Sequence, residues 1–202
     1  MDLREQLGNI DIYLVDQLLK GRLVPGMSLL DAGCGGGRNL VWFLRRGYEV
    51  FGADESPEAV EQVRRLAAVL APHLPPESFQ VADLADLPFP DARFDAVLCS
   101  AVLHFARDEA HFDRMLDELW RVLRPGGLFF ARLASTIGME GRVQPLGSHW
   151  YQVPDGSRRF LADEAMLRTT THRLGGTWLD PLKTTLVEDL RAMTTWVLRK
   201  PR

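Results

Sequence analysis

Short apolar runs alternate with amphipathic stretches along most of the chain, and this alternation predicts strands that alternate with helices. The run FDAVLCS at 94–100 is almost continuously apolar, as a strand buried on both faces of a sheet is. The other apolar runs are short and bounded by turn residues. They predict four more strands, at 28–31, 48–54, 79–83 and 128–135.

Apolar residues at helical spacing lie between these strands. Ser56 followed by Pro57 is a helix start signal, and it predicts a helix over 56–71. Further helices are predicted over 11–21, from the glycine-rich segment to about Gly47, and from Phe112 to Leu123, before Pro125–Gly127 as a stop. Strands and helices in this order predict a parallel sheet with helices on both faces and right-handed crossovers. The predicted fold class is therefore α/β, doubly wound.

The last third of the chain departs from this rhythm. Residues 136–161 are rich in glycine and proline and have little periodicity, which predicts a long loop or lid-like insertion. A helix is expected at 163–174, followed by strands at 178–188 and 192–200 that are joined by a short turn. So short a connection predicts an antiparallel hairpin at the sheet edge.

Composition limits the kind of protein that this chain forms. Its 202 residues are 46% hydrophobic and 25% charged, which is ordinary for one globular domain, here 1–202. The net charge of −3 and the lack of long basic runs argue against nucleic acid as a substrate. Cys34 and Cys99 have neither metal-ligand nor disulfide spacing. The amphipathic start lacks the order of a signal peptide, and no apolar run approaches the roughly 18 residues of a membrane span. We therefore expect a cytoplasmic protein without a membrane partner, and no oligomeric state is indicated.

The segment LLDAGCGGGRNL at 29–40 carries the clearest functional signal. Glycine is needed where the backbone adopts positive φ or where a ligand comes close to it, so several glycines between a strand and a helix indicate a binding loop. The glycines are Gly33, Gly35, Gly36 and Gly37.

The spacing of these glycines limits the classes of ligand that the loop can bind. The dinucleotide fingerprint would need a glycine in place of Arg38 or Leu40, and the phosphate-binding loop would need a Lys-Ser or Lys-Thr pair. Neither pattern fits. The segment fits acid-x-Gly-x-Gly-x-Gly from Asp31, with a second acid, Asp54, at the end of the next strand.

Through these residues the chain resembles the class I methyltransferases that use S-adenosylmethionine, over most of its length. The resemblance implies a Rossmann-like, mostly parallel seven-stranded sheet whose last strand is antiparallel. It implies that Asp31 organises the loop and the methionine end of the cofactor, that Gly33 and Gly35 let the cofactor approach, and that Asp54 accepts from the ribose hydroxyls. Alternatively, the two acids only cap the helices that follow them.

Ligands of open α/β sheets bind beyond the carboxyl ends of the strands, so other residues there are candidates. The resemblance implies that Asp83 accepts from the adenine amino group and that the Leu84 N–H serves a ring nitrogen; otherwise Asp83 is a solvated loop acid. Arg38 pairs with the cofactor carboxylate or is exposed. Ser100, at the end of its strand, is assigned to the same site. Tyr13 covers the cofactor or belongs to the core.

Candidates for catalysis and substrate binding follow strand 94–100. The segment lacks the Pro-Pro-aromatic motif of methyltransferases that act on base nitrogens. His104 is placed to take a proton from a nucleophile, or it packs over the cofactor without proton transfer. In the lid-like insertion, His149, Trp150 and Tyr151 offer stacking, and Arg158 with Arg159 would hold an anion; the alternative is a solvated loop.

The sequence thus predicts methyl transfer from S-adenosylmethionine to a small-molecule acceptor. The glycine loop followed by Arg-Asn and the compact tail loosely resemble the tellurite-resistance type, which methylates oxyanions, while a metabolite with an oxygen or nitrogen nucleophile fits equally. Two other functions remain open. One is cofactor binding without catalysis, and the other is a nucleotide-dependent oxidoreductase, against which the glycine spacing argues.

Overall fold

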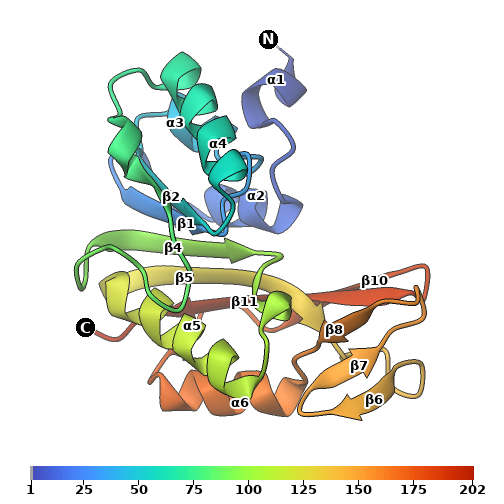
Figure 1. Ribbon diagram of the computed structural model, residues 1–202. Coiled ribbons are helices and arrows are strands. Elements are labelled where there is room, and N and C mark those ends of the chain that lie inside the picture. The colour runs from blue at the N-terminus through green and yellow to red at the C-terminus, as the bar shows by residue number, and fades with distance from the viewer. Residues whose placement is uncertain (1) are drawn as a thin grey trace.

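The computed structural model describes residues 2–202 and centres on a twisted sheet (Figure 1). The strand order is β10-β11-β5-β4-β1-β2-β3, and the short strand β9 also pairs with β11. Strands β1 to β5 pair in parallel, whereas β11 is antiparallel to both β5 and β10. The strands are β1 Ser28–Ala32, β2 Glu49–Asp54, β3 Phe79–Val81, β4 Phe94–Ser100, β5 Leu123–Ser135, β9 Thr177–Trp178, β10 Lys183–Val187 and β11 Arg191–Arg199. The predicted doubly wound sheet with an antiparallel edge hairpin is confirmed.

Helices cover both faces of this sheet (Figure 1). On one face lie α2 Ile12–Leu19, α3 Val41–Arg45 and α4 Pro57–Leu70, and on the other lie α5 Glu109–Val122 and α6 Glu164–Arg173. Ser56 caps α4 as predicted, because its Oγ accepts from the Ala59 N–H at 3.2 Å. Short elements are α1 Leu3–Leu7, which was not predicted, and the 3-10 helices η1 Pro76–Ser78 and η2 Leu103–Phe105.

Residues 136–161 form a structural element, so the prediction of a long loop without one was wrong. They hold a three-stranded antiparallel sheet of β6 Gln144–Gly147, β7 Trp150–Gln152 and β8 Arg158–Phe160. Its strands are too short for a hydrophobic period to appear. Buried Val153 and Leu161, which follow β7 and β8, pack with Ala134 of β5, so tertiary contacts support the small sheet.

Strand β5 begins earlier than predicted, because Pro125–Gly127, expected to separate the helix from a strand starting at 128, lie within it. Helix α5 ends at Val122, and Leu123 already pairs with Phe94 of β4 before the register shifts. The shift accommodates the extra residues as a bulge, where Gly126 has a φ of +77°.

Within residues 2–202, no helix is long and apolar enough to cross a membrane.

Candidate functional site

The glycine loop between β1 and α3 is fastened to the end of β2. The N–H groups of Gly33 and Cys34 both donate to the Ala53 carbonyl, at 2.7 and 3.0 Å. The Gly35 N–H donates to Oδ2 of Asp54 at 2.8 Å, and the Ser56 N–H donates to Oδ1 at 3.0 Å. The Asp54 carboxylate therefore holds the loop and the entry to α4 together.

Three glycines of the loop are required for different physical reasons. At Gly33 a Cβ would lie 2.2 Å from Cγ2 of Val102, so the segment after β4 leaves no room for a side chain. At Gly37 a Cβ would meet Val63 of α4 at 2.8 Å. At Gly35, which has a φ of +51°, nothing lies within 4 Å. Gly35 thus serves the backbone conformation and leaves open space beside the loop.

A cavity of about 350 Å³ lies beyond the carboxyl ends of β1, β2 and β4, and we call it the cofactor cavity. Of the residues predicted for the cofactor, those that line it are Gly33, Arg38, Asp54, Asp83, Leu84 and Ser100. The other lining residues, which sequence reasoning missed, are Glu55, Ala101, Val102, Phe105, His111 and Met115. Glu55 stands directly after Asp54, so its position could have been inferred; the rest come from the segment after β4 and from α5.

Asp31, at the end of β1, is not among the residues that line the cavity. Its side chain is buried, and neither carboxylate oxygen has a hydrogen-bond partner among the described residues. Burial raises the pKa of Asp31 to about 7, since little solvent is left to stabilise the charge, while the Arg38 guanidinium lowers it. The glycine loop is thus bonded to Asp54 and not to Asp31, while the role predicted for Asp31 at the methionine end of the cofactor stays a prediction.

The opposite wall of the cavity carries a carboxylate and an imidazole. Oδ1 of Asp83 accepts from the Ala85 N–H at 2.8 Å, and this bond lowers the pKa of Asp83. Nε2 of His111 lies 3.7 Å from that oxygen, while its Nδ1 accepts from the Arg107 N–H at 3.1 Å. His111 Nε2 therefore carries the hydrogen of the neutral ring, and it is buried without a hydrogen-bond partner among residues 2–202. It is a donor in the lining of the cavity.

Polar side chains link this cavity to a second one. Nη2 of Arg38 donates to Oγ of Ser100 at 3.3 Å, and that hydroxyl donates to Oδ2 of buried Asp11 at 3.3 Å. The same oxygen of Asp11 pairs with Nη1 of Arg132 at 3.2 Å. Arg38 is exposed, yet it lines the cavity and its guanidinium is bonded to Ser100.

Tyr13 does not line the cofactor cavity. Its hydroxyl is 2.7 Å from Oγ1 of Thr185 on β10, and its ring packs under the Arg132 guanidinium. The structure gives it a packing role between α2 and the edge hairpin, so the prediction that it covers the cofactor is not supported.

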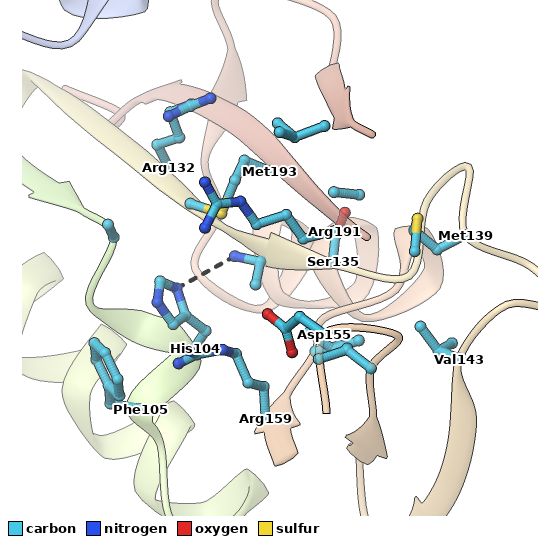
Figure 2. Close-up of a pocket in the computed structure, with 16 residues that line it drawn as sticks. His104, Phe105, Arg132, Ser135, Met139, Val143, Asp155, Arg159, Arg191 and Met193 are labelled. Carbon is cyan, nitrogen blue, oxygen red and sulfur yellow. Dashed lines mark hydrogen bonds between the residues drawn. The ribbon is translucent and has the colours of Figure 1, made fainter. Parts of the chain in front are cut away.

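The second cavity, also about 350 Å³, adjoins the first, and we call it the acceptor cavity (Figure 2). Ala101 and Phe105 line both cavities. Ala101 has a φ of +65°, a left-handed conformation that is costly for a side chain with a Cβ. Its N–H donates to the Arg132 carbonyl at 2.7 Å, which holds this strained turn where the two cavities meet.

His104 lines the acceptor cavity in a defined tautomer. Its Nδ1 accepts from the Ala134 N–H at 3.3 Å, the dashed line in Figure 2, so Nε2 carries the hydrogen. Burial, aided by the Arg159 charge, lowers the pKa of His104 to about 4. The imidazole is neutral at pH 7 with its acceptor nitrogen occupied. It is therefore a hydrogen-bond donor, and the predicted role as a general base is not supported.

Three arginines from distant segments line the same cavity: Arg132 on β5, Arg159 on β8 and Arg191 on β11. Figure 2 shows the guanidinium groups of Arg159 and Arg191 on the side of His104, with Met139 and Val143 on the opposite side. Of these arginines, sequence reasoning named only Arg159. Strand β5 brings Arg132 to the cavity, and the edge hairpin brings Arg191.

The remaining substrate candidates lie outside both cavities. Trp150 donates from Nε1 to the Arg107 carbonyl at 3.0 Å, and Tyr151 packs against the cluster of Ala134, Val153 and Leu161. His149 has Nε2 3.8 Å from Glu109 of α5. Arg158 is exposed, because neighbouring strand residues point to opposite faces and Arg159 takes the cavity side. The structure does not support substrate contacts for these four residues.

Comparison with known families identifies residues 30–131 as a match to the methyltransferase domain. This match spans β1 to the middle of β5 and includes the glycine loop, Asp54, Asp83 and His104.

Individual relatives extend this similarity. The malonyl-[acyl-carrier protein] O-methyltransferase of Serratia marcescens is 37% identical over 139 residues, covering 68% of this chain and 48% of that protein. The enzyme of the same name from Pseudescherichia vulneris is 31% identical over 169 residues, covering 82% of this chain and 61% of that protein. The chain thus spans about half the length of the curated relatives it matches.

Solved structures share the fold. A crystal structure from Methanosarcina mazei, described as a methyltransferase dependent on S-adenosylmethionine, superposes with a TM-score of 0.74 at 21% identity, covering 91% of this chain and 97% of that one.

Proposed function

The chain belongs to the methyltransferase domain family, and from this premise we propose that it transfers a methyl group from S-adenosylmethionine to a small-molecule acceptor. The observation that carries the proposal is the pairing of two adjoining cavities, which share Ala101 and Phe105. The cofactor cavity has polar groups for the adenosine and methionine parts of S-adenosylmethionine, and the acceptor cavity has room for a second molecule.

The residues present fit this cofactor. His111 Nε2 is a buried donor without a partner among residues 2–202, and Gly35 leaves open space beside the loop. The Asp54 carboxylate, though already bonded to two N–H groups, keeps lone pairs for the ribose hydroxyls. Asp83 and the Leu84 N–H would hold the adenine, and Arg38 the cofactor carboxylate.

Bound here, S-adenosylmethionine supplies a methyl group activated by a positively charged sulfur. The protein's part is then to align the acceptor and to exclude water. The strained turn at Ala101 forms the boundary across which the two molecules meet. His104, neutral and donating from Nε2, orients the acceptor.

Two experiments test the proposal. Calorimetric titration should show binding of S-adenosylhomocysteine and none of NAD, whereas the reverse result would indicate the oxidoreductase. Incubation with methyl-labelled S-adenosylmethionine and a metabolite extract should label a small molecule. Binding without any labelling would make the chain a cofactor-binding protein without catalysis.

The finer resemblance to tellurite-resistance methyltransferases stays a prediction. The arginines of the acceptor cavity would accept such an oxyanion, but Met139 and Val143 make its other side apolar. We therefore favour an organic acceptor. A cytoplasmic location also stays a prediction.

A further inference from the structure

The charges around the acceptor cavity are unbalanced. Arg132, Arg159 and Arg191 contribute three guanidinium groups, and Asp155 is the only carboxylate among the lining residues. Arg132 is partly neutralised by Asp11, yet its Nε is buried without a hydrogen-bond partner among residues 2–202. Arg159 lies over the Phe105 ring at 5.8 Å, at the boundary with the cofactor cavity. The cavity is therefore prepared for an anion.

Each candidate proton acceptor in the described lining is already bonded to a protein group through at least one atom. Nδ1 of His104 is occupied by the Ala134 N–H. Oδ1 of Asp155 accepts from the hydroxyl and the N–H of Ser157, at 2.6 and 2.9 Å, and these bonds lower the pKa of Asp155. The Ser135 hydroxyl is shared with Thr194 at 2.7 Å. Asp155 keeps its second oxygen unbonded, but its lowered pKa makes it a weak base. The cavity therefore favours a nucleophile that has no proton to lose.

The side of the cavity opposite His104 is apolar. Met139 and Val143 line it in Figure 2, and Val153 and Leu161 belong to the same lining. Contact with these side chains stabilises an acceptor that has a hydrocarbon body. A bare inorganic oxyanion would leave this side without a partner.

From these three features we propose that the acceptor is a carboxylic acid with an apolar body, and that its carboxylate oxygen is methylated to give a methyl ester. This inference rests on the proposed methyl transfer. A lone pair of the oxygen forms the bond to the methyl carbon while the carbon–sulfur bond breaks, and its electron pair stays on sulfur. A carboxylate is ionised at pH 7, so no proton moves. Guanidinium groups bind one carboxylate oxygen or both and leave lone pairs for the reaction.

The bond formed gives a test that needs no knowledge of the acceptor. A metabolite extract is incubated with the protein and tritiated methyl S-adenosylmethionine, and the products are treated with base. Methyl esters release labelled methanol, which is counted in the vapour phase, whereas methyl groups on nitrogen or on a hydroxyl oxygen stay in solution. Volatile label supports the proposal. Label that is stable to base overturns it and leaves the proposed methyl transfer intact, and no label above a boiled control overturns both.

The arginines are tested by binding without the cofactor. Octanoate is the probe and neutral octanamide is its match in size, with thermal stabilisation as the measurement. We expect a preference for octanoate that falls roughly tenfold or more in apparent affinity in Arg159→Ala and in Arg191→Ala, as loss of a charged hydrogen bond predicts. Arg158→Ala, which removes the same charge next to Arg159 but outside the cavity, should keep the preference. Equal binding of acid and amide, or an equal loss in Arg158→Ala, would overturn the arginine assignment.

Discussion

The two cavities are similar in volume but are built in different ways. The cofactor cavity takes most of its polar side chains from residues at or near the ends of β2, β3 and β4, such as Asp54, Asp83 and Ser100. The acceptor cavity is made of side chains from β5, β8 and β11 that are far apart in the sequence. One site depends on strand ends that the fold always brings together, and the other on how the C-terminal third packs. The first kind of site suits a cofactor that many enzymes share, and the second suits an acceptor that differs from one enzyme to another.

The largest effect on stability and on cofactor binding should come from a substitution in the glycine loop. Gly33→Ala places a Cβ 2.2 Å from Val102 at a φ of +78°, so we expect a loss of about 4 kcal/mol in the free energy of unfolding, together with loss of cofactor binding. Urea unfolding and calorimetry measure the two effects. Gly35→Ala is the control, because it meets no atom within 4 Å and should cost about 1 kcal/mol in backbone strain alone. Equal losses in both variants would contradict the loop geometry.

Burial of His104 in the acceptor cavity should make the stability of the protein depend on pH. The pKa of His104 is lowered to about 4, below its value of 6.5 when unfolded, so between these pH values the unfolded chain binds more protons. Stability should therefore fall as the pH drops from 6.5 to 4, by about 3 kcal/mol from this residue. Urea unfolding of the wild type and of His104→Gln at pH 7 and pH 4.5 measures it. Parallel losses in the two proteins would mean that the imidazole titrates normally.

A substitution of Asp54 tests whether the two cavities bind their ligands independently. Asp54→Ala removes the acceptor for Gly35 and Ser56 and for the ribose, so affinity for S-adenosylhomocysteine should fall by about 2 kcal/mol. Octanoate binding to the cofactor-free variant should stay unchanged. An unchanged cofactor affinity in a folded variant would remove Asp54 from the site.

The smallest effect concerns Tyr13, which lines neither cavity but contacts Arg132 of the acceptor cavity. Tyr13→Phe removes the hydrogen bond between the Tyr13 hydroxyl and Thr185 and keeps the ring under Arg132. The free energy of unfolding should therefore fall by about 1 kcal/mol. Cofactor affinity, measured by calorimetry, should not change. A clear loss of affinity would restore the prediction that Tyr13 covers the cofactor.

Local patterns were enough for most of the fold and for the cofactor cavity. Ser56 and Pro57 specify the start of α4, and the apolar run 94–100 coincides with β4. Both signals, a helix cap and a continuous apolar run, are made by residues that are neighbours in the sequence. Gly33, Asp54 and Asp83, whose roles the family resemblance implied, all line the cofactor cavity. Each stands at or just after the end of a strand, and parallel strands bring those ends to one edge of the sheet.

The acceptor cavity was decided by the tertiary structure. From the sequence, Arg158 and Arg159 were equivalent, and only the pairing of β8 determines which of them faces the cavity. Arg132 and Arg191 gave no local signal, because a lone arginine on a strand is the same in sequence whether it faces a cavity or solvent. The sequence by itself determined the sheet through short-range patterns, and its glycine loop and acids carried the resemblance that gave the family and the site we propose for the cofactor. The chemistry of the acceptor depends on which distant side chains share one space, and packing alone decides that.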